Sequence, residues 1–197
     1  MEYLVLNNKK EWKRGEYSLV PLREEDIFLI KKWRNEQMDV LRQKKLLSDD
    51  DQVAYYHDVI RPLFGETEPE QVLFSFLHSN TCIGYGGLVH IDWSKREGEV
   101  SFLVDTVRAG NPDVYERDFR VFLSLIKSIA CEELKLERIC TEVYDIRPLH
   151  VLILENNGFV LKKRLKNFLV IRGKPVDSLL HEFFRKNYDK CVNDQYF

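Results

Sequence analysis

The sequence predicts a mixed α/β fold built on one central sheet, and three observations carry that prediction. Residues 97–105 form a mostly apolar run of strand length. Between residues 118 and 134 apolar side chains recur at three- and four-residue steps, which is typical of one face of a helix. Residues 138–145 indicate a second strand, after which Pro148 opens a short helix that Gly158 closes. A strand, a crossover helix and a strand form a parallel unit, and ligands tend to bind at the carboxyl ends of such strands.

The elements before this unit are predicted by alternation and by helix caps. Residues 17–22 alternate and indicate a first strand. Acidic residues at 24–26 lie where the macrodipole favours them, in the first turn of a helix that runs to about Gln37. Ser48 is a plausible cap for a second helix ending near Ile60, with Asp51 in the capping-box position.

Two hairpins complete the predicted order of elements. The first joins residues 72–78 to residues 83–92, and the glycines between positions 84 and 87 indicate a bulge or close strand packing. The second joins residues 165–171 to residues 176–184 across a turn at 172–174. The predicted order is therefore strand, two helices, hairpin, strand, helix, strand, helix and hairpin.

Length and composition predict one domain over residues 1–197, with its core at about 17–185 and peripheral termini. The net charge of −2 gives no electrostatic reason to expect nucleic acid or an anionic membrane as partner. No apolar run approaches the ~20 residues of a membrane span, and the amino-terminal residues lack the pattern of a secretory signal. Four cysteines without ligand spacing indicate neither a metal site nor a redox pair, so we expect a cytoplasmic protein.

Three motifs stand in a fixed order along these elements. They are Trp33-Arg34-Asn35 in the first helix, residues 99–105 on the central strand and residues 154–159 before the last hairpin. In this order they resemble the GNAT superfamily of acyl-CoA N-acyltransferases, and within it the branch that acetylates ribosomal-protein N-termini and amino sugars. The resemblance implies a twisted, mixed but mostly antiparallel sheet with helices on both faces, in which a splayed strand pair binds acyl-CoA.

The resemblance also implies acetyl-CoA as acyl donor and suggests where it binds. Its pantetheine arm is expected to pair with the backbone of Phe102, Leu103 and Val104. Its pyrophosphate is expected at the start of the next helix, where unpaired amides attract anions. This chain departs from the family there, because an extra stretch at 109–114 and two large side chains replace the glycine-rich loop. Phosphate contacts are therefore expected to be rearranged among Arg108, Arg117, Asp118, Phe119 and Arg120, although any one of the arginines taken alone is more typical of a solvated surface.

Acetyl transfer requires a group that accepts a proton from the amine. Glu99 is the first candidate base, and a solvent-facing strand residue is the alternative interpretation. His90 and Asp92 are the second candidates, because alternation places both on one strand face. The tyrosine that often serves as acid in this family is replaced by Leu154. Tyr144 or a water molecule is then the candidate proton donor, and departure of an unprotonated thiolate is the alternative.

The acceptor is predicted to be a small primary amine, most simply an amino sugar or a nucleotide-linked amino sugar. Its expected contacts are Trp33, Arg34, Trp93 and Glu142. Acetylation of protein N-termini or of antibiotic amines stays open, as does a degenerate member that binds a ligand without catalysis. A homodimer formed through the last strands is also possible.

Overall fold

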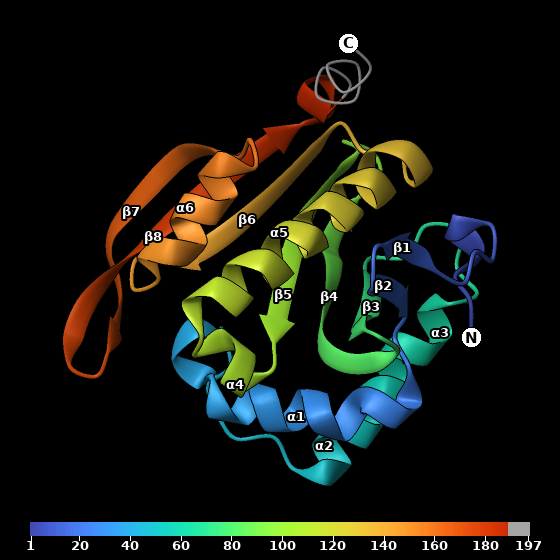
Figure 1. Ribbon diagram of the computed structural model, residues 1–197, viewed down its shortest axis with the longest axis horizontal. Helices are drawn as coiled ribbons and strands as arrows, with labels where there is room; N and C mark the ends of the chain where they lie inside the picture. Colours follow the sequence, from blue (N-terminus) through green and yellow to red (C-terminus); the bar gives the residue numbers. More distant parts are fainter. Residues whose placement is uncertain (189–197) are drawn as a thin grey trace.

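The computed structural model describes residues 1–188 and contains an eight-stranded sheet in the order β1-β2-β3-β4-β5-β6-β8-β7 (Figure 1). The strands are β1 (Trp12–Arg14), β2 (Tyr17–Pro21), β3 (Val72–His78), β4 (Thr81–Asp92), β5 (Glu97–Val104), β6 (Arg138–Tyr144), β7 (Val160–Ile171) and β8 (Lys174–Phe184). The α-helices are α1 (Ile27–Glu36), α2 (Asp49–Ala54), α3 (Arg61–Leu63), α4 (Thr106–Ala109), α5 (Pro112–Ser128) and α6 (Pro148–Asn156). Of the paired strands in this sheet, β5 and β6 alone run parallel. The predicted mixed, mostly antiparallel sheet is confirmed.

Helices cover both faces of the sheet. On one face α5 packs against β3 and β5, where Phe122 contacts Phe76 edge-on and Phe102 obliquely. Tyr85 points to the opposite face, because its neighbour Gly86 faces Phe122, and there Arg34 of α1 contacts its hydroxyl. The sheet therefore separates α5 and α6 from α1 and α2.

The predicted start of α2 is confirmed, and the predicted start of α1 is confirmed in part. Ser48 and Asp51 form the predicted capping box of α2, which continues as a π-helical stretch over Tyr55–Ile60. The acidic residues Glu24–Asp26 form a separate 3₁₀ turn ahead of α1. Both helices therefore lie where the sequence predicts them, with local changes of helical type.

The largest difference from prediction lies at the start of α5. The helix begins at Pro112, six residues before the predicted start at Asp118. Asn111 caps it by accepting the amide of Val114, and proline suits the first helical position. The extra stretch predicted at 109–114 is therefore mostly helical. Arg117 to Phe119 belong to the second turn of α5. The short helix α4 between β5 and α5 was not predicted.

The buried core also begins earlier than residue 17. Tyr3 and Leu6 are fully buried, and the Tyr3 hydroxyl donates to the carbonyl of Leu73 and accepts its amide proton. Strand β1 was missed because its three residues are too few for a period-two pattern to register. Strand β7 starts at Val160, five residues before the predicted hairpin.

Glycines in β4 allow its neighbours to approach closely, as the sequence suggested. A Cβ atom on Gly86 would lie 2.2 Å from the carbonyl oxygen of Ser101 and 2.8 Å from Cζ of Phe122. A Cβ on Gly84 would lie 2.6 Å from the carbonyl oxygen of Leu103. The interpretation of close strand packing is confirmed, and no phosphate loop is formed by these residues.

This packing predicts a steric cost for Gly86→Ala. The added methyl group has backbone on one side and a buried ring on the other, so we expect a loss of about 3 kcal/mol in unfolding free energy, the upper end of the range for overpacking. Urea denaturation measures it. Gly65→Ala is the matched control, because its nearest neighbour would be 3.8 Å away, and its change should stay within about 0.5 kcal/mol. Equal stabilities of the two variants would contradict the packing argument.

Candidate active site

The parallel pairing of β5 with β6 stops early and opens a cleft. The ladder joins Glu97, Gly98 and Glu99 to residues 138–140 and ends there. Beyond this point the strands diverge toward their carboxyl ends (Figure 1), and a cavity of about 320 Å³ lies between them. From Val100 onward the β6-facing edge of β5 has lost its strand partner, apart from one 3.4 Å contact between the Thr141 hydroxyl and the carbonyl of Val100. The splayed pair that the family resemblance implies is present.

Alternate residues of the two strands line the cleft toward opposite faces of the sheet. Glu99 and Ser101 face the side of α1, whereas Val100 and Phe102 face α5. Residues 40–43, which follow α1, close the first side, and Phe119 with His150 closes the second.

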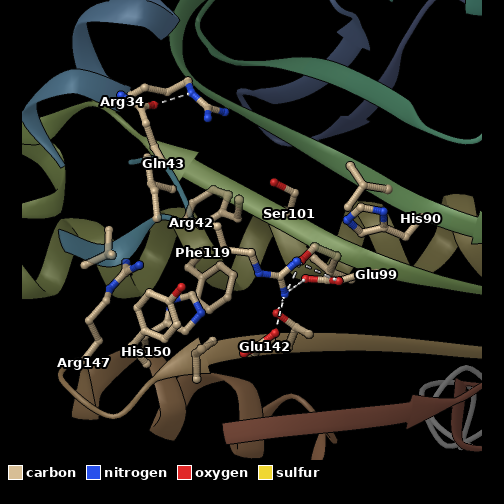
Figure 2. A pocket seen from close by; sticks show the side chains of 18 residues that line it. Arg34, Arg42, Gln43, His90, Glu99, Ser101, Phe119, Glu142, Arg147 and His150 are labelled. Atoms are coloured by element: carbon tan, nitrogen blue, oxygen red, sulfur yellow. Dashed lines mark hydrogen bonds and ion pairs between the residues drawn. The ribbon is translucent and has the colours of Figure 1, made fainter. Parts of the chain in front are cut away.

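Two carboxylates meet on the α1 side, and an arginine bridges them. Nη2 of Arg42 lies 2.7 Å from Oε1 of Glu99 and 2.7 Å from Oε2 of Glu142. The Ser178 hydroxyl donates a further hydrogen bond to Glu142. Figure 2 shows the guanidinium between the two acids. The site thus places two negative charges at the point where β5 and β6 part.

The motif Trp33-Arg34-Asn35 holds the segment that carries Arg42. The Trp33 indole donates to the carboxylate of Asp105 at the end of β5, at 2.8 Å. Arg34 donates to the Tyr85 hydroxyl at 2.6 Å and to the side-chain oxygen of Gln43 at 3.0 Å. The Asn35 side chain bonds both the amide and the carbonyl of Leu47. Each residue of the motif therefore fixes α1 or the following segment against the sheet.

On the α5 side the cleft wall is aromatic. The Phe119 ring stacks on Phe102 at 4.7 Å and on His150 at 4.3 Å. The Tyr115 hydroxyl lies 2.6 Å from Nδ1 of His150 and also accepts a hydrogen bond from Arg147, whose guanidinium lies over the Tyr115 ring. Helices α5 and α6 are thus joined beside the cleft.

Burial keeps this second wall uncharged except for Arg147. Burial, with smaller contributions from Arg147 and His181, holds the pKa of His150 well below its usual range, so the ring is neutral. Burial also raises the pKa of Tyr115 to about 12. Arg147 lines the cleft and forms no ion pair within residues 1–188.

The predicted catalytic residues divide between the cleft and a turn outside it. Glu99, His90 and Tyr144 line the cleft. His90 has a positive φ of 51° and lies where the register between β4 and β5 shifts, which turns it away from Asp92. Asp92 instead belongs to a turn outside the cleft. The Lys95 ammonium lowers the pKa of Asp92, and hydrogen bonds from the Ser94 hydroxyl and the Lys95 amide lower it further.

The predicted substrate contacts divide in the same way. Arg34 and Glu142 line the cleft. Trp33 is buried against Asp105, and the Trp93 indole donates to the carbonyl of Pro69 at 3.0 Å. Both tryptophans have structural partners that do not involve the cleft.

Of the predicted cofactor residues, Phe102 and Phe119 line the cleft. Leu103 is buried opposite Tyr85 of β4, and the carbonyl of Val104 accepts the Gln37 amide at 2.8 Å. The remaining four lie along α4 and α5: Arg108 pairs with the buried Asp118, Arg117 donates to the Tyr17 hydroxyl, and Arg120 pairs with Glu116 on the surface. Their role in cofactor binding stays a prediction.

The cleft suits the pantetheine arm of acetyl-CoA more clearly than it suits the phosphates of that molecule. The strand edge left open beyond Glu99 suits a pantetheine arm that pairs as an extra strand. At the phosphate end Asp105 accepts the amides of Val107 and Arg108 at the start of α4, and Asn111 accepts the amide of Val114 at the start of α5. Side chains such as Arg147, rather than glycine amides, are therefore available to the phosphates.

Sequence reasoning did not identify Arg42 or Gln43 as site residues. Arg42 lies in the basic run RQKK, without helical or strand periodicity, and such a run is typical of solvated surface. Nothing in the sequence placed Arg147 or His150 at the cleft, which both line. No local signal distinguished these residues.

Comparison with protein families gives a match to the model described as an acetyltransferase (GNAT) domain, over residues 19–180. The chain belongs to the GNAT acetyltransferase family. It is an N-acetyltransferase that uses acetyl-CoA as acyl donor, as the resemblance implied. Comparison with curated protein sequences gave no match.

Solved structures of GNAT enzymes share the fold. Spermidine N-acetyltransferase from Vibrio cholerae in complex with CoA and spermine is 19% identical, with a TM-score of 0.75 over 89% of this chain and 99% of that one. A dodecameric form of the Vibrio cholerae enzyme is 18% identical, with a TM-score of 0.71 over 89% and 97% of the two chains. A protein described as a putative acetyltransferase is 16% identical, with a TM-score of 0.68 over 92% and 90%.

Three further structural facts bear on the predictions from composition. None of the helices in residues 1–188 is both long and apolar enough to cross a membrane. The same residues hold no group of three metal-ligating side chains close enough to bind an ion. Cys82 and Cys140 are free thiols, and Cys191 lies outside the described residues.

The neutral, buried His150 predicts a pH dependence of this GNAT domain's stability. Because its folded pKa lies below the unfolded value of about 6.5, the unfolded chain binds more protons below that pH. Stability should therefore fall as pH drops below about 6.5, by up to about 1.4 kcal/mol per pH unit from this group.

Denaturation of His150→Gln between pH 5 and 8 measures this contribution, and the variant should show a shallower slope than the wild type. His78→Gln is the control, because His78 is partly exposed at the end of β3 beside Glu16. A slope unchanged by the His150 substitution would show that its protonation costs nothing.

Proposed function

We propose that this GNAT enzyme acetylates a small primary amine, which binds between Glu99 and Glu142 on the α1 side of the cleft. The observation that supports this most directly is the pair of carboxylates at the splay point, each 2.7 Å from one cationic nitrogen. An amine arrives mostly as an ammonium ion at neutral pH, and two acids on rigid strands suit such a group.

Glu99 is the proposed general base. When bound, acetyl-CoA supplies an acetyl thioester whose carbonyl carbon is the electrophile. The ammonium must lose a proton before its nitrogen can attack, and Glu99 can take it while Glu142 keeps the nitrogen in place. Burial and the nearby Glu142 raise the pKa of Tyr144, so its hydroxyl holds a proton in the cleft at neutral pH. His90 and Asp92 stay alternative bases.

Two classes of acceptor have support. A polyamine is favoured by the carboxylate pair, and Vibrio cholerae spermidine N-acetyltransferase, which has the same fold, is described in complex with CoA and spermine. The nucleotide-linked amino sugar expected from sequence is favoured by Arg34 and Arg147, which line the cleft without an ion pair in residues 1–188. We favour the polyamine, because the acids lie at the reacting end of the cleft.

A screen for acetyl-CoA-dependent turnover with spermidine, a nucleotide-linked 4-amino sugar and an N-terminal peptide distinguishes these acceptors. Turnover with spermidine alone supports the favoured class, and turnover with the sugar alone replaces it. Acetyl-CoA binding without turnover of any amine would favour the non-catalytic alternative.

We further propose that the protein is cytoplasmic and that copies associate through the last strands. The free thiols of Cys82 and Cys140 support the first proposal. Exposed apolar side chains on the edge strand β7, among them Phe168 and Val170, support the second. Light scattering of the purified chain tests association, and a monomer at micromolar concentration would exclude it.

If Glu99 is the base, its substitution should lower kcat without weakening the binding of acetyl-CoA. Glu99→Gln should lower kcat about 100-fold or more, because proton removal by a positioned base contributes on that scale. Its affinity for acetyl-CoA, measured by calorimetry, should not change. Glu97→Gln is the matched control on the same strand, since Glu97 pairs with Arg138 outside the cleft. A Glu99→Gln enzyme with normal kcat would move the base to His90 or Asp92.

A further inference from the structure

A single nitrogen of Arg42 satisfies two carboxylates that belong to different strands. Nη2 lies 2.7 Å from an oxygen of Glu99 on β5 and 2.7 Å from an oxygen of Glu142 on β6 (Figure 2). These are the lengths of charge-assisted hydrogen bonds. The position of Nη2 therefore marks a point where one cationic nitrogen contacts both acids.

An ammonium group has the chemistry that this point requires. It carries one positive charge and three donors, so it can donate to both acids and keep a third proton free. Without any cation the two carboxylates would face each other in a partly buried cleft, where like charges repel and neither is well solvated. The site needs a cation, and in this structure the chain supplies its own.

We propose that Arg42 is an internal stand-in for the acceptor, so that a substrate binds by exchanging its ammonium for the Arg42 guanidinium. This inference rests on the proposed function of the same cleft and adds the element that sets its specificity. An acceptor lacking a cationic nitrogen cannot replace Arg42 without leaving two acids unpaired, and is rejected. Affinity for the amine is thereby reduced by competition from the chain itself.

The two sides of the exchange differ in how firmly they are held. Glu99 and Glu142 are on strands, have side chains less than one-fifth exposed, and Glu142 is also held by Ser178. The Arg42 side chain is 49% exposed and follows the short 3₁₀ turn Met38–Val40, in a segment without helix or strand. Within residues 1–188 the Arg42 side chain donates hydrogen bonds to these two acids and to no other residue. The guanidinium can therefore swing into solvent while the acids stay.

The nearby arginines do not have this property. Arg34 is fixed by Tyr85 and Gln43, and Arg147 by Tyr115. Neither contacts a carboxylate in residues 1–188, so their departure would leave no acid unpaired. Arg172, in the turn between β7 and β8, pairs with Asp39 outside the cleft. Asp39 lies on the same connecting stretch as Arg42. Arg172 therefore provides a matched control for the loss of an arginine that restrains this segment.

The test is calorimetric titration of the full chain with 1,4-diaminobutane, in the absence of acetyl-CoA. If Arg42 competes with the ligand, Arg42→Ala and Arg42→Gln should each bind the diamine about tenfold more tightly than the wild type, equivalent to about 1.4 kcal/mol. Arg42→Lys keeps a competing cation and should remain close to the wild type. Arg172→Ala should not differ from the wild type. In each protein 1,4-butanediol, which has the same length without charge, should not bind.

The opposite role for Arg42 gives the opposite result. If Arg42 braces the two strands and shapes the site, both Arg42→Ala and Arg42→Gln bind the diamine more weakly or equally, and the inference is wrong. A gain seen equally in Arg172→Ala would assign the effect to loosening of the segment and would also overturn it. Thermal denaturation confirms that each variant is folded before titration.

The same set of proteins separates this inference from the proposed function. Binding is measured without the acyl donor, so tighter binding by Arg42→Ala supports the exchange even if no amine is acetylated. Turnover of an amine with unchanged affinity in Arg42→Ala would retain the acetyltransferase function and reject the exchange.

Discussion

The early end of the β5–β6 ladder is the constraint on which the site depends. Two parallel strands pair over three residues and then diverge, so backbone groups of β5 beyond Glu99 lose the partner that a sheet normally provides. Backbone donors and acceptors away from water require partners, and a ligand that pairs as a strand meets that requirement. The same divergence creates the cleft and sets Glu99 and Glu142 on its two strands, close enough for one nitrogen of Arg42 to contact both. The two acids and the unpaired edge of β5 therefore lie together because the sheet is interrupted there.

The two sides of the cleft also differ in charge. The α1 side holds both acids, with Arg42 as their counter-ion. The α5 side is lined by Phe102, Phe119 and a neutral His150, with Arg147 at its margin. A cationic acceptor and an anionic donor are thus favoured on opposite faces.

The sequence predicted the elements with strong periodicity and the residues whose role follows from alternation. Glu99, Glu142 and Tyr144 were expected to face the splayed strands, and all three line the cleft. Asp92 was expected beside His90, but the register shift between β4 and β5 breaks the period of two on which that expectation relied. The start of α5 was placed late because apolar periodicity outweighed the Asn111-Pro112 signal. Arg42 lies in an irregular segment, and the course of that segment through the fold brings it to the site. No local sequence pattern predicts that course.

The internal caps at α4 and α5 have a consequence for how the donor is held. A helix start binds phosphate well when its first amides are free and a glycine lets the ligand approach. Here Asp105 takes the amides of Val107 and Arg108, and Asn111 takes that of Val114, so these donors are already satisfied. Asp105 also accepts the Trp33 indole, which ties the cap to α1. Releasing it would cost a helix cap and a buried tryptophan contact together. Side-chain cations at the cleft margin, of which Arg147 is already placed by Tyr115, are therefore the less costly source of phosphate contacts, and the glycine-rich loop could be lost without losing the donor site.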